Sequence, residues 1–262
     1  MKKLNTLVAI LVLVFVVIGL KSQTYPVPRF SFHLHGGYTT TLPDLKGDFP
    51  GDLTGNPPKN PIPYFVNNGF NFGGDFKYLL DKKATFGLIL TATYSMLSSG
   101  DKGTTALDTN SILGIGEGTW RTDMNIITIG VGAEYDFAPK RPANPFVNVQ
   151  FTTNIIGGKT KFDRSAGNVE SYSADMTSAV RFGAQFAAGV DVKLSRNIGV
   201  IIGGRYHFAN LFGKDSTSNT ATTYGLNDKE TTTSKSKKMA YLQFFAGISF
   251  YFGMKPKPVA KK

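Results

Sequence analysis

Residues 179–194 read AVRFGAQFAAGVDVKL, and every second residue from Val180 to Leu194 is apolar. The residues between them, from Ala179 to Lys193, are small, polar or charged. This alternation with a period of two is typical of a β-strand that has one apolar and one polar face. It is held over sixteen residues. At about 3.3 Å per residue it predicts a strand of about 50 Å, much longer than the usual strand of about five or six residues.

Seven further segments alternate in the same way and are rich in β-branched and aromatic residues. They cover residues 30–40, 69–79, 84–97, 121–137, 146–156, 198–209 and 239–252. Short and long connections follow one another without exception, and the long ones, rich in Gly, Pro, Ser, Thr, Asn and Asp, are residues 41–68, 98–119, 157–178 and 210–238. With an even number of strands, this order puts every short turn and both ends of the sheet on one side, and every long loop on the other.

The pattern predicts an all-β fold, an eight-stranded antiparallel up-and-down transmembrane β-barrel with long extracellular loops. In hydrocarbon every backbone N–H and C=O must pair within the protein, so the sheet must close on itself. The polar face then lines an interior that side chains can fill. A secreted, soluble eight-stranded barrel that binds a ligand would alternate too. The Gly, Ala, Ser and Thr on the polar faces favour a narrow lumen over a solvated exterior.

The two ends of the chain are predicted to lie outside the barrel. Lys2 and Lys3 precede an apolar run from Leu7 to Leu20, which is the pattern of a secretory signal peptide over residues 1–22. An uncleaved anchor is the alternative, although the run is shorter than the ~20 residues of a spanning helix. Residues 23–253 are then the barrel domain, and residues 254–262 form a short basic periplasmic tail.

Composition narrows the possible functions. The chain has no Cys, which excludes disulfides, thiolate chemistry and a lipoprotein anchor. The formal net charge of +11 falls to +8 when Lys2, Lys3 and Lys21 leave with the signal peptide. This charge suits anionic lipid head groups. An exported chain without a nucleic-acid motif is not expected to bind nucleic acid.

We expect a polar network inside the barrel. Its predicted members project inward from the polar faces of the strands: His33, His35, Asp75, Lys77, Glu134, Arg181, Asp191, Lys193, Arg205 and His207. Because buried charges persist only when they are paired, salt bridges should cross the lumen. No catalytic residue, metal or cofactor is predicted.

Four weaker patterns were weighed against this network. His33, His35 and His207 would bind a metal only if the barrel brought them within ~2.1 Å of one ion. Ser31 beside His33 and His35 resembles a lipid-modifying site but lacks a positioned base. DLKGDFPGD, residues 44–52, has carboxylates for Ca²⁺ without the EF-hand spacing. GIGEG, residues 114–118, lacks the context of a phosphate loop and is interpreted as a flexible loop with left-handed glycines.

The chain resembles the outer-membrane β-barrel domain family that includes OmpA- and OmpX-type eight-stranded barrels. The resemblance rests on the basic and apolar start, the eight alternating segments and the closing strand MAYLQFFAGISFYFG at residues 239–253, and it covers about residues 28–253. It implies the cell outer membrane of Gram-negative type, with outer-membrane lipids and the barrel-insertion machinery as partners. Two features depart from the family. Its members often end on the last aromatic residue of the closing strand, whereas here ten residues follow Phe252. OmpA-type members also carry a periplasmic peptidoglycan-binding domain, and this tail is too short to be one.

These observations predict a non-enzymatic structural or surface-interaction scaffold with a largely plugged lumen. Its long loops would meet an extracellular partner that the sequence does not identify. The alternative is a narrow, porin-like channel for small solutes or ions.

Overall fold

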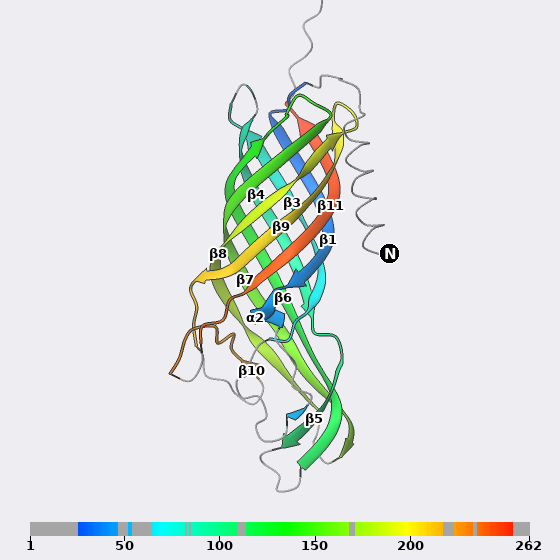
Figure 1. Cartoon of the computed structure of the whole chain (residues 1–262), viewed down its shortest axis with the longest axis vertical. Helices are drawn as coiled ribbons and strands as arrows, with labels where there is room; N and C mark the ends of the chain where they lie inside the picture. Colours follow the sequence, from blue (N-terminus) through cyan, green and yellow to red (C-terminus); the bar gives the residue numbers. More distant parts are fainter. Residues whose placement is uncertain are drawn as a thin grey trace, which may run out of the picture.

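A closed ring of eight antiparallel strands forms the body of the protein (Figure 1). The computed structural model describes residues 26–46, 52–53, 64–81, 83, 85–108, 114–167, 171–216, 223–232 and 235–253. The predicted signal peptide and basic tail lie outside these residues. The strands of the ring are β1 (Phe30–Thr41), β3 (Asn68–Leu79), β4 (Phe86–Ser98), β6 (Gly114–Asp136), β7 (Ala143–Gly167), β8 (Tyr172–Lys193), β9 (Ile198–Phe212) and β11 (Ala240–Phe252).

Each strand pairs with its neighbour along the chain, and the last strand pairs with the first. Phe30 lies opposite Phe252 and Thr41 opposite Tyr241, so β1 and β11 close the ring over their whole length. The predicted barrel is therefore confirmed. Short turns join β3 to β4, β6 to β7 and β8 to β9. The start of β1 and the end of β11 lie at the same side of the barrel as these turns (Figure 1). No helix of the described residues is long and apolar enough to cross a bilayer.

The long connections contain more β-structure than the sequence predicted. β6, β7 and β8 have 23, 25 and 22 residues and run far beyond the ring on the side opposite the turns (Figure 1). β5 (Lys102–Asp108) pairs with β6. We call the parts of β5–β8 beyond the ring the extension. The prediction that residues 98–119 and 157–178 are loops is wrong, because most of these residues pair across strands.

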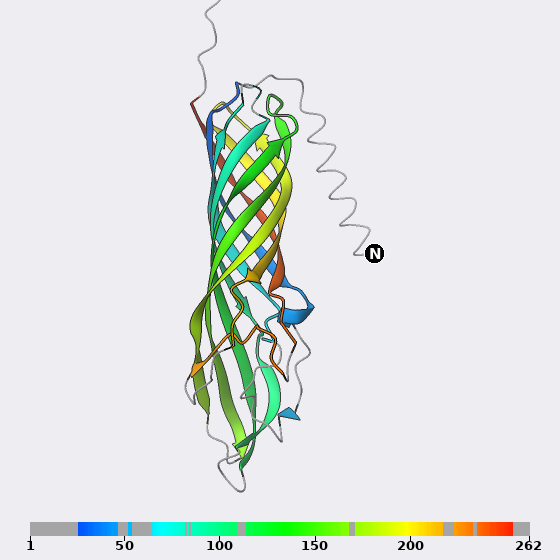
Figure 2. The ribbon, with the colours of Figure 1, turned by 90° about the vertical axis from the view of Figure 1, so that its left-hand side faces the viewer.

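The other two long connections hold short elements. Residues 41–68 contain α2 (Pro43–Lys46) and β2 (Asp52–Leu53), and β10 (Thr223–Tyr224) lies between β9 and β11. β2 pairs with β5, and β10 pairs with β8, both in parallel. Figure 2 shows α2 and the chain before β11 beside the open end of the ring.

The polarity of the two sheet faces inverts where β6 leaves the ring. Inside the ring the outward residues are apolar and exposed, as in Val131, Ile129 and Ile127, whereas the next outward residues are Asn125, Asp123 and Arg121. The buried face changes in the opposite sense, from Thr128 to Ile126, Met124 and Trp120. Lipid surrounds the first part and water the second, so the face that must be apolar changes sides. Ile127 is therefore the last residue of the exposed apolar face on this strand.

Candidate functional site

All ten residues predicted to face the lumen lie inside the barrel and are at most 6% exposed. Because successive side chains of a strand point to opposite faces, each lies on the face that carries the other buried polar residues. The strands bring them together in layers along the axis, and the layer nearest the short turns is the most charged.

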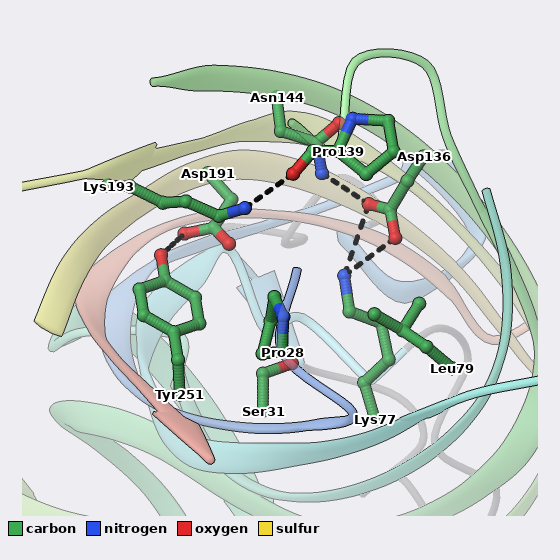
Figure 3. A pocket seen from close by; sticks show the side chains of 10 residues that line it. All are labelled: Pro28, Ser31, Lys77, Leu79, Asp136, Pro139, Asn144, Asp191, Lys193 and Tyr251. Carbon is green, nitrogen blue, oxygen red and sulfur yellow. Dashed lines mark hydrogen bonds and ion pairs between the residues drawn. The ribbon is translucent and has the colours of Figure 1, made fainter. Parts of the chain in front are cut away.

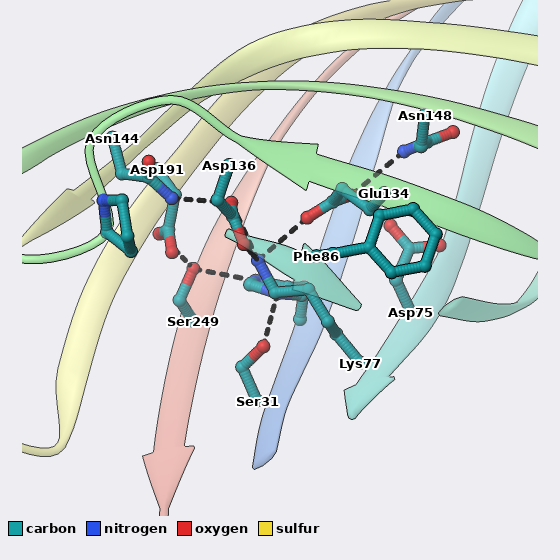
Figure 4. Close-up of polar contacts among 12 residues, drawn as sticks. Ser31, Asp75, Lys77, Phe86, Glu134, Asp136, Asn144, Asn148, Asp191 and Ser249 are labelled. Atoms are coloured by element: carbon teal, nitrogen blue, oxygen red, sulfur yellow. Dashed lines mark hydrogen bonds and ion pairs between the residues drawn. The ribbon is translucent and has the colours of Figure 1, made fainter. Parts of the chain in front are cut away.

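Lys77 is the centre of this first layer (Figure 4). Its Nζ donates to Glu134 Oε1 at 2.7 Å and to Asp136 Oδ2 at 3.0 Å. Asn148 donates to the other oxygen of Glu134, and Asn144 donates to Asp136. Both carboxylates are thereby held by one ammonium and two amides. Asp136 was missing from the predicted network, although it follows Glu134 by two residues on the same face.

Asp191 lies near Lys77, across the opening of the barrel at the end that carries the short turns. It accepts hydrogen bonds from Ser249 Oγ at 2.8 Å and from the Tyr251 hydroxyl at 2.6 Å. His33 bridges Ser249, through Nδ1 at 2.8 Å, and Ser31, through Nε2 at 3.1 Å. These hydroxyls and the imidazole connect Asp191 to strands β1 and β11 without a cation.

Lys193 also lacks a carboxylate partner. Its Nζ donates to the Pro139 carbonyl at 2.5 Å and lies 5.7 Å from the centre of the Tyr251 ring. Figure 3 shows these side chains around a small pocket at the mouth. Among the described residues neither Asp191 nor Lys193 takes part in a salt bridge, so the salt bridges expected to cross the lumen do not include these two charges.

An ion pair across the lumen, between β9 and β3, forms the middle layer. Arg205 Nη2 of β9 donates to Asp75 Oδ1 at 3.1 Å and Oδ2 at 2.9 Å on β3. Thr91 donates to the same carboxylate at 2.6 Å, and His35 Nε2 lies 3.3 Å from it. The Arg205 guanidinium also lies 4.9 Å from the centre of the Phe245 ring. This pair is the cross-lumen bridge that the charges predicted.

Several buried polar atoms of the middle layer have no hydrogen-bond partner within the described part of the chain. They include Arg205 Nε and Nη1, both amide atoms of Gln185, Gln150 Oε1 and His35 Nδ1. Unpartnered buried groups of this kind are usually satisfied by water. The middle of the lumen therefore has the chemistry of a hydrated space.

His207 lies toward the extracellular end. It hydrogen bonds to Gln243 at 2.7 Å and stacks on Tyr241 with 4.6 Å between the ring centres. The three histidines thus have separate partners. No group of three His, Cys, Asp or Glu side chains that could hold a metal occurs within the residues described.

Arg181 is bound at the extracellular mouth by a residue that the sequence did not indicate. Its Nε and Nη2 donate to Asp228 at 2.8–3.1 Å, and Asp228 follows β10 in a long connection. Asn210 and the Asp215 amide donate to the same carboxylate at 2.8 and 3.0 Å. Burial acts to raise the pKa of Asp228, but these donors outweigh it and hold the pKa below its usual value. Arg181 therefore pairs with a residue of a long connection and not with another of the predicted lumen residues.

An apolar cluster lies at the same mouth. Leu45, Tyr64 and Val66 come from the first long connection and Leu226 and Met239 from the last. They pack on residues of the ring that are themselves buried: Leu97, Met124, Ile126, Ile156 and Ala209. The Tyr64 hydroxyl donates to the Leu226 carbonyl, and the Lys238 amide to Asp44. We call these two connections and the ring residues beneath them the cap.

Two of the weaker sequence patterns have different outcomes. The GIGEG segment is the start of β6 and pairs with β5 and β7. None of its glycines is among the left-handed residues of the described chain, so its interpretation as a flexible loop is wrong. Most of the candidate Ca²⁺ segment, residues 47–51, lies outside the described residues.

Comparisons with solved structures find barrels that share little sequence with this chain. Neisserial surface protein A is 14% identical, with 85% of this chain and 97% of that chain covered and a TM-score of 0.43. The outer membrane protein OprG from Pseudomonas aeruginosa is 12% identical, with 88% and 99% covered and a TM-score of 0.42. Ail, the attachment invasion locus protein of Yersinia pestis, is 15% identical, with 85% and 99% covered and a TM-score of 0.38.

A search of curated protein sequences finds no match. The family model of the outer membrane protein beta-barrel domain matches residues 12–232, which is most of the chain. The match spans seven of the eight ring strands and three of the long connections in full. The chain therefore belongs to the outer membrane β-barrel domain family, and its location is the outer membrane.

Proposed function

We propose that the protein is a non-enzymatic scaffold whose lumen is closed and whose extension and cap present a binding surface outside the cell. The observation that carries this proposal is that buried side-chain contacts lie at two levels of the barrel. Arg205 of β9 pairs with Asp75 of β3 in the middle layer, and the cap places buried apolar side chains at the extracellular mouth.

The extension supports a role at the surface. Its outward face carries exposed charges of both signs. The cations include Arg121, Lys159 and Lys161, and the acids include Asp175. Arg121 donates to Asp123 at 2.9 Å, and Lys159 lies 3.6 Å from Asp175. A rigid, hydrated sheet held away from the bilayer is suited to contact with a macromolecule outside the cell. Outer-membrane lipids and the barrel-insertion machinery are the remaining proposed partners.

The site geometry also favours a role without catalysis. Ser31, His33 and Ser249 form a hydrogen-bonded chain that ends at Asp191. Ser31 is 1% exposed, and the adjoining pocket has room for about one water molecule. An acyl chain or a sugar could not reach the Ser31 hydroxyl in this arrangement.

A narrow channel is the second candidate, and the unpartnered polar atoms around Gln185 and Arg205 favour it. A hydrated middle layer would become a conducting path if the cap opened and the Arg205–Asp75 pair separated. The amount of water-filled lumen therefore decides between the two candidates.

Flux across liposomes tests the proposal. Protein purified from outer membranes is reconstituted, its folded state is verified by the shift in gel mobility on boiling, and the release of ions and of solutes of increasing size is measured. Liposomes with an open porin give the positive control. We expect no flux above that of empty liposomes. Reproducible, size-limited flux from the folded barrel would contradict the closed lumen and establish the channel.

A further inference from the structure

Exposed cations surround the end of the barrel that carries the short turns. Each of the three turns carries at least one, and another lies directly before β1: Arg29, Lys83, Lys140, Arg141 and Arg196. We call these five residues the basic collar. Asp81 is the one acid on the described turns, and its carboxylate caps its own turn by accepting from Thr85 Oγ1 and the Phe86 amide. On the described turns, the positive charge of the collar is therefore little neutralised by acidic side chains.

The collar lies directly beside the lipid-facing apolar band. Arg29 precedes Phe30, Lys83 lies between Leu80 and Phe86, Lys140 and Arg141 follow Phe137, and Arg196 lies between Leu194 and Ile198. All of these apolar neighbours except the half-buried Phe30 are exposed, Phe137 at 59% and Leu194 at 62%. In an outer-membrane barrel such exposed side chains meet the acyl chains. The cations are thereby held at the level of the head groups.

Arg29 shows this arrangement in atomic detail. Its Nη2 donates to the Tyr78 hydroxyl at 2.6 Å, and its Cζ lies 5.3 Å from the centre of the Tyr78 ring. Tyr78 stacks on Phe30, with 5.1 Å between ring centres. The guanidinium thus lies on the outer wall over an aromatic interface residue, where its remaining donors can bind a phosphate.

The opposite end of the molecule differs in charge pattern. On the extension, cations and acids are interspersed, and several are paired, as in Arg121 with Asp123 and Lys159 with Asp175. A collar of one sign at the turn end is therefore not a consequence of the overall positive charge. Its cations lie on three different turns and before β1, around the turn end of the barrel, which matches a leaflet of lipids better than a single soluble anion.

We propose that the basic collar binds the phosphates of anionic phospholipids in the periplasmic leaflet of the outer membrane. The collar and the aromatic band beside it act together, since the band fixes the depth of the barrel and the collar selects the head groups around it. Each basic residue at an anionic surface contributes about 1 kcal/mol, which corresponds to about a fivefold preference for an anionic lipid over a zwitterionic one.

Spin-labelled lipids test this binding directly. Protein purified from outer membranes is reconstituted in phosphatidylcholine vesicles with a trace of spin-labelled phosphatidylglycerol or phosphatidylcholine, and the motionally restricted fraction of each label is measured. The collar variant is R29Q/K83Q/K140Q/R141Q/R196Q. The matched control removes the same number of exposed lysines from the other end: K46Q/K161Q/K229Q/K235Q/K238Q.

We expect the wild-type protein and the control to favour labelled phosphatidylglycerol about fivefold, and the collar variant to lose most of that preference. The preference should fall in concentrated salt. An absent preference in the wild type, equal losses in both variants, or a preference that the collar variant keeps would each overturn the proposal. Displacement by inorganic phosphate well beyond that by sodium chloride at equal ionic strength would overturn it as well, in favour of a site for a soluble anion. If the collar variant yields little folded protein, K83Q/K140Q/R196Q repeats the test with one substitution per turn.

Discussion

Arg205 and Asp75 are 1% and 2% exposed and pair across the lumen. Removing one member of such a pair leaves an uncompensated buried charge and costs about 3–5 kcal/mol, whereas removing both costs less. R205Q should therefore lower the free energy of unfolding by about this amount, and R205Q/D75N should restore part of it. Urea unfolding in vesicles, followed by the boiling-dependent gel shift, measures both. A double variant that loses as much stability as R205Q and D75N lose together would show that the two residues act independently.

Asp228 attaches the last long connection to the mouth in a pH-dependent way. Its pKa is lowered in the folded protein, so its ionised form contributes stability above its unfolded pKa of about 3.9, and this contribution is lost as the pH falls through the lower, folded pKa. Below about pH 4 the backbone of residues 223–232 should therefore exchange hydrogen faster, after correction for intrinsic rates. D228N should already exchange fast at neutral pH and change little on acidification. Hydrogen exchange with mass spectrometry measures this, and an acid response that D228N retains would assign it to another group.

At the scale of the strand, two adjacent glycines of β1 provide a matched test of packing. A Cβ on Gly37 would lie 1.8 Å from the Phe244 carbonyl oxygen, whereas a Cβ on Gly36 would meet its nearest neighbour, the Asn71 oxygen, at 3.5 Å. G37A must displace the backbone of β11 and should destabilise the barrel by about 1–3 kcal/mol. G36A should be nearly neutral. The same urea assay compares them, and equal effects would contradict the close approach of β1 and β11 at Gly37.

The ring strands could be predicted because lipid outside and a polar lumen inside give each strand an uninterrupted period of two. The extension could not be predicted in the same way. On β6 and β7 the alternation continues past Ile127 and Ile155, but the faces exchange their polarity, as in Lys159, Lys161 and Phe162. A bulge at Ile156–Gly158 also shifts the register between β7 and β8. Without knowledge of where the bilayer ends, such a segment has the composition of a loop.

The same reasoning explains which lumen contacts could be predicted. A residue on a ring strand is placed by the alternation, so the inward position of Asp75, Lys77 and Arg205 followed from the sequence. The partner of such a residue can be predicted from the sequence only when that partner is also on a ring strand. Asp228 lies in a connection whose path depends on tertiary packing of the cap, and nothing in the local sequence relates it to Arg181, 47 residues earlier.

At the scale of the whole molecule, the proposed closed lumen has two closures in series along one axis. They are the Asp75–Arg205 pair in the middle layer and, at the extracellular mouth, the cap with its Arg181–Asp228 pair. Resistances in series add, so the path stays closed while either closure remains. On the proposal of a closed scaffold, a single lesion should therefore leave the conductance unchanged, however much it lowers the stability.

Combining the two lesions gives the corresponding prediction. Neither D75A/R205A nor R181A/D228A should raise ion flux across liposomes, whereas the variant with all four substitutions should conduct. The Lys77 layer stays intact in all of these variants, and its cation and carboxylates should limit that flux without blocking it. R121Q/D123N removes an exposed Arg–Asp pair of the extension and, added to either double variant, should leave flux at the background level. Flux from D75A/R205A alone would mean that the cap already admits ions. The Asp75–Arg205 pair in the middle layer would then be what keeps the wild-type lumen closed.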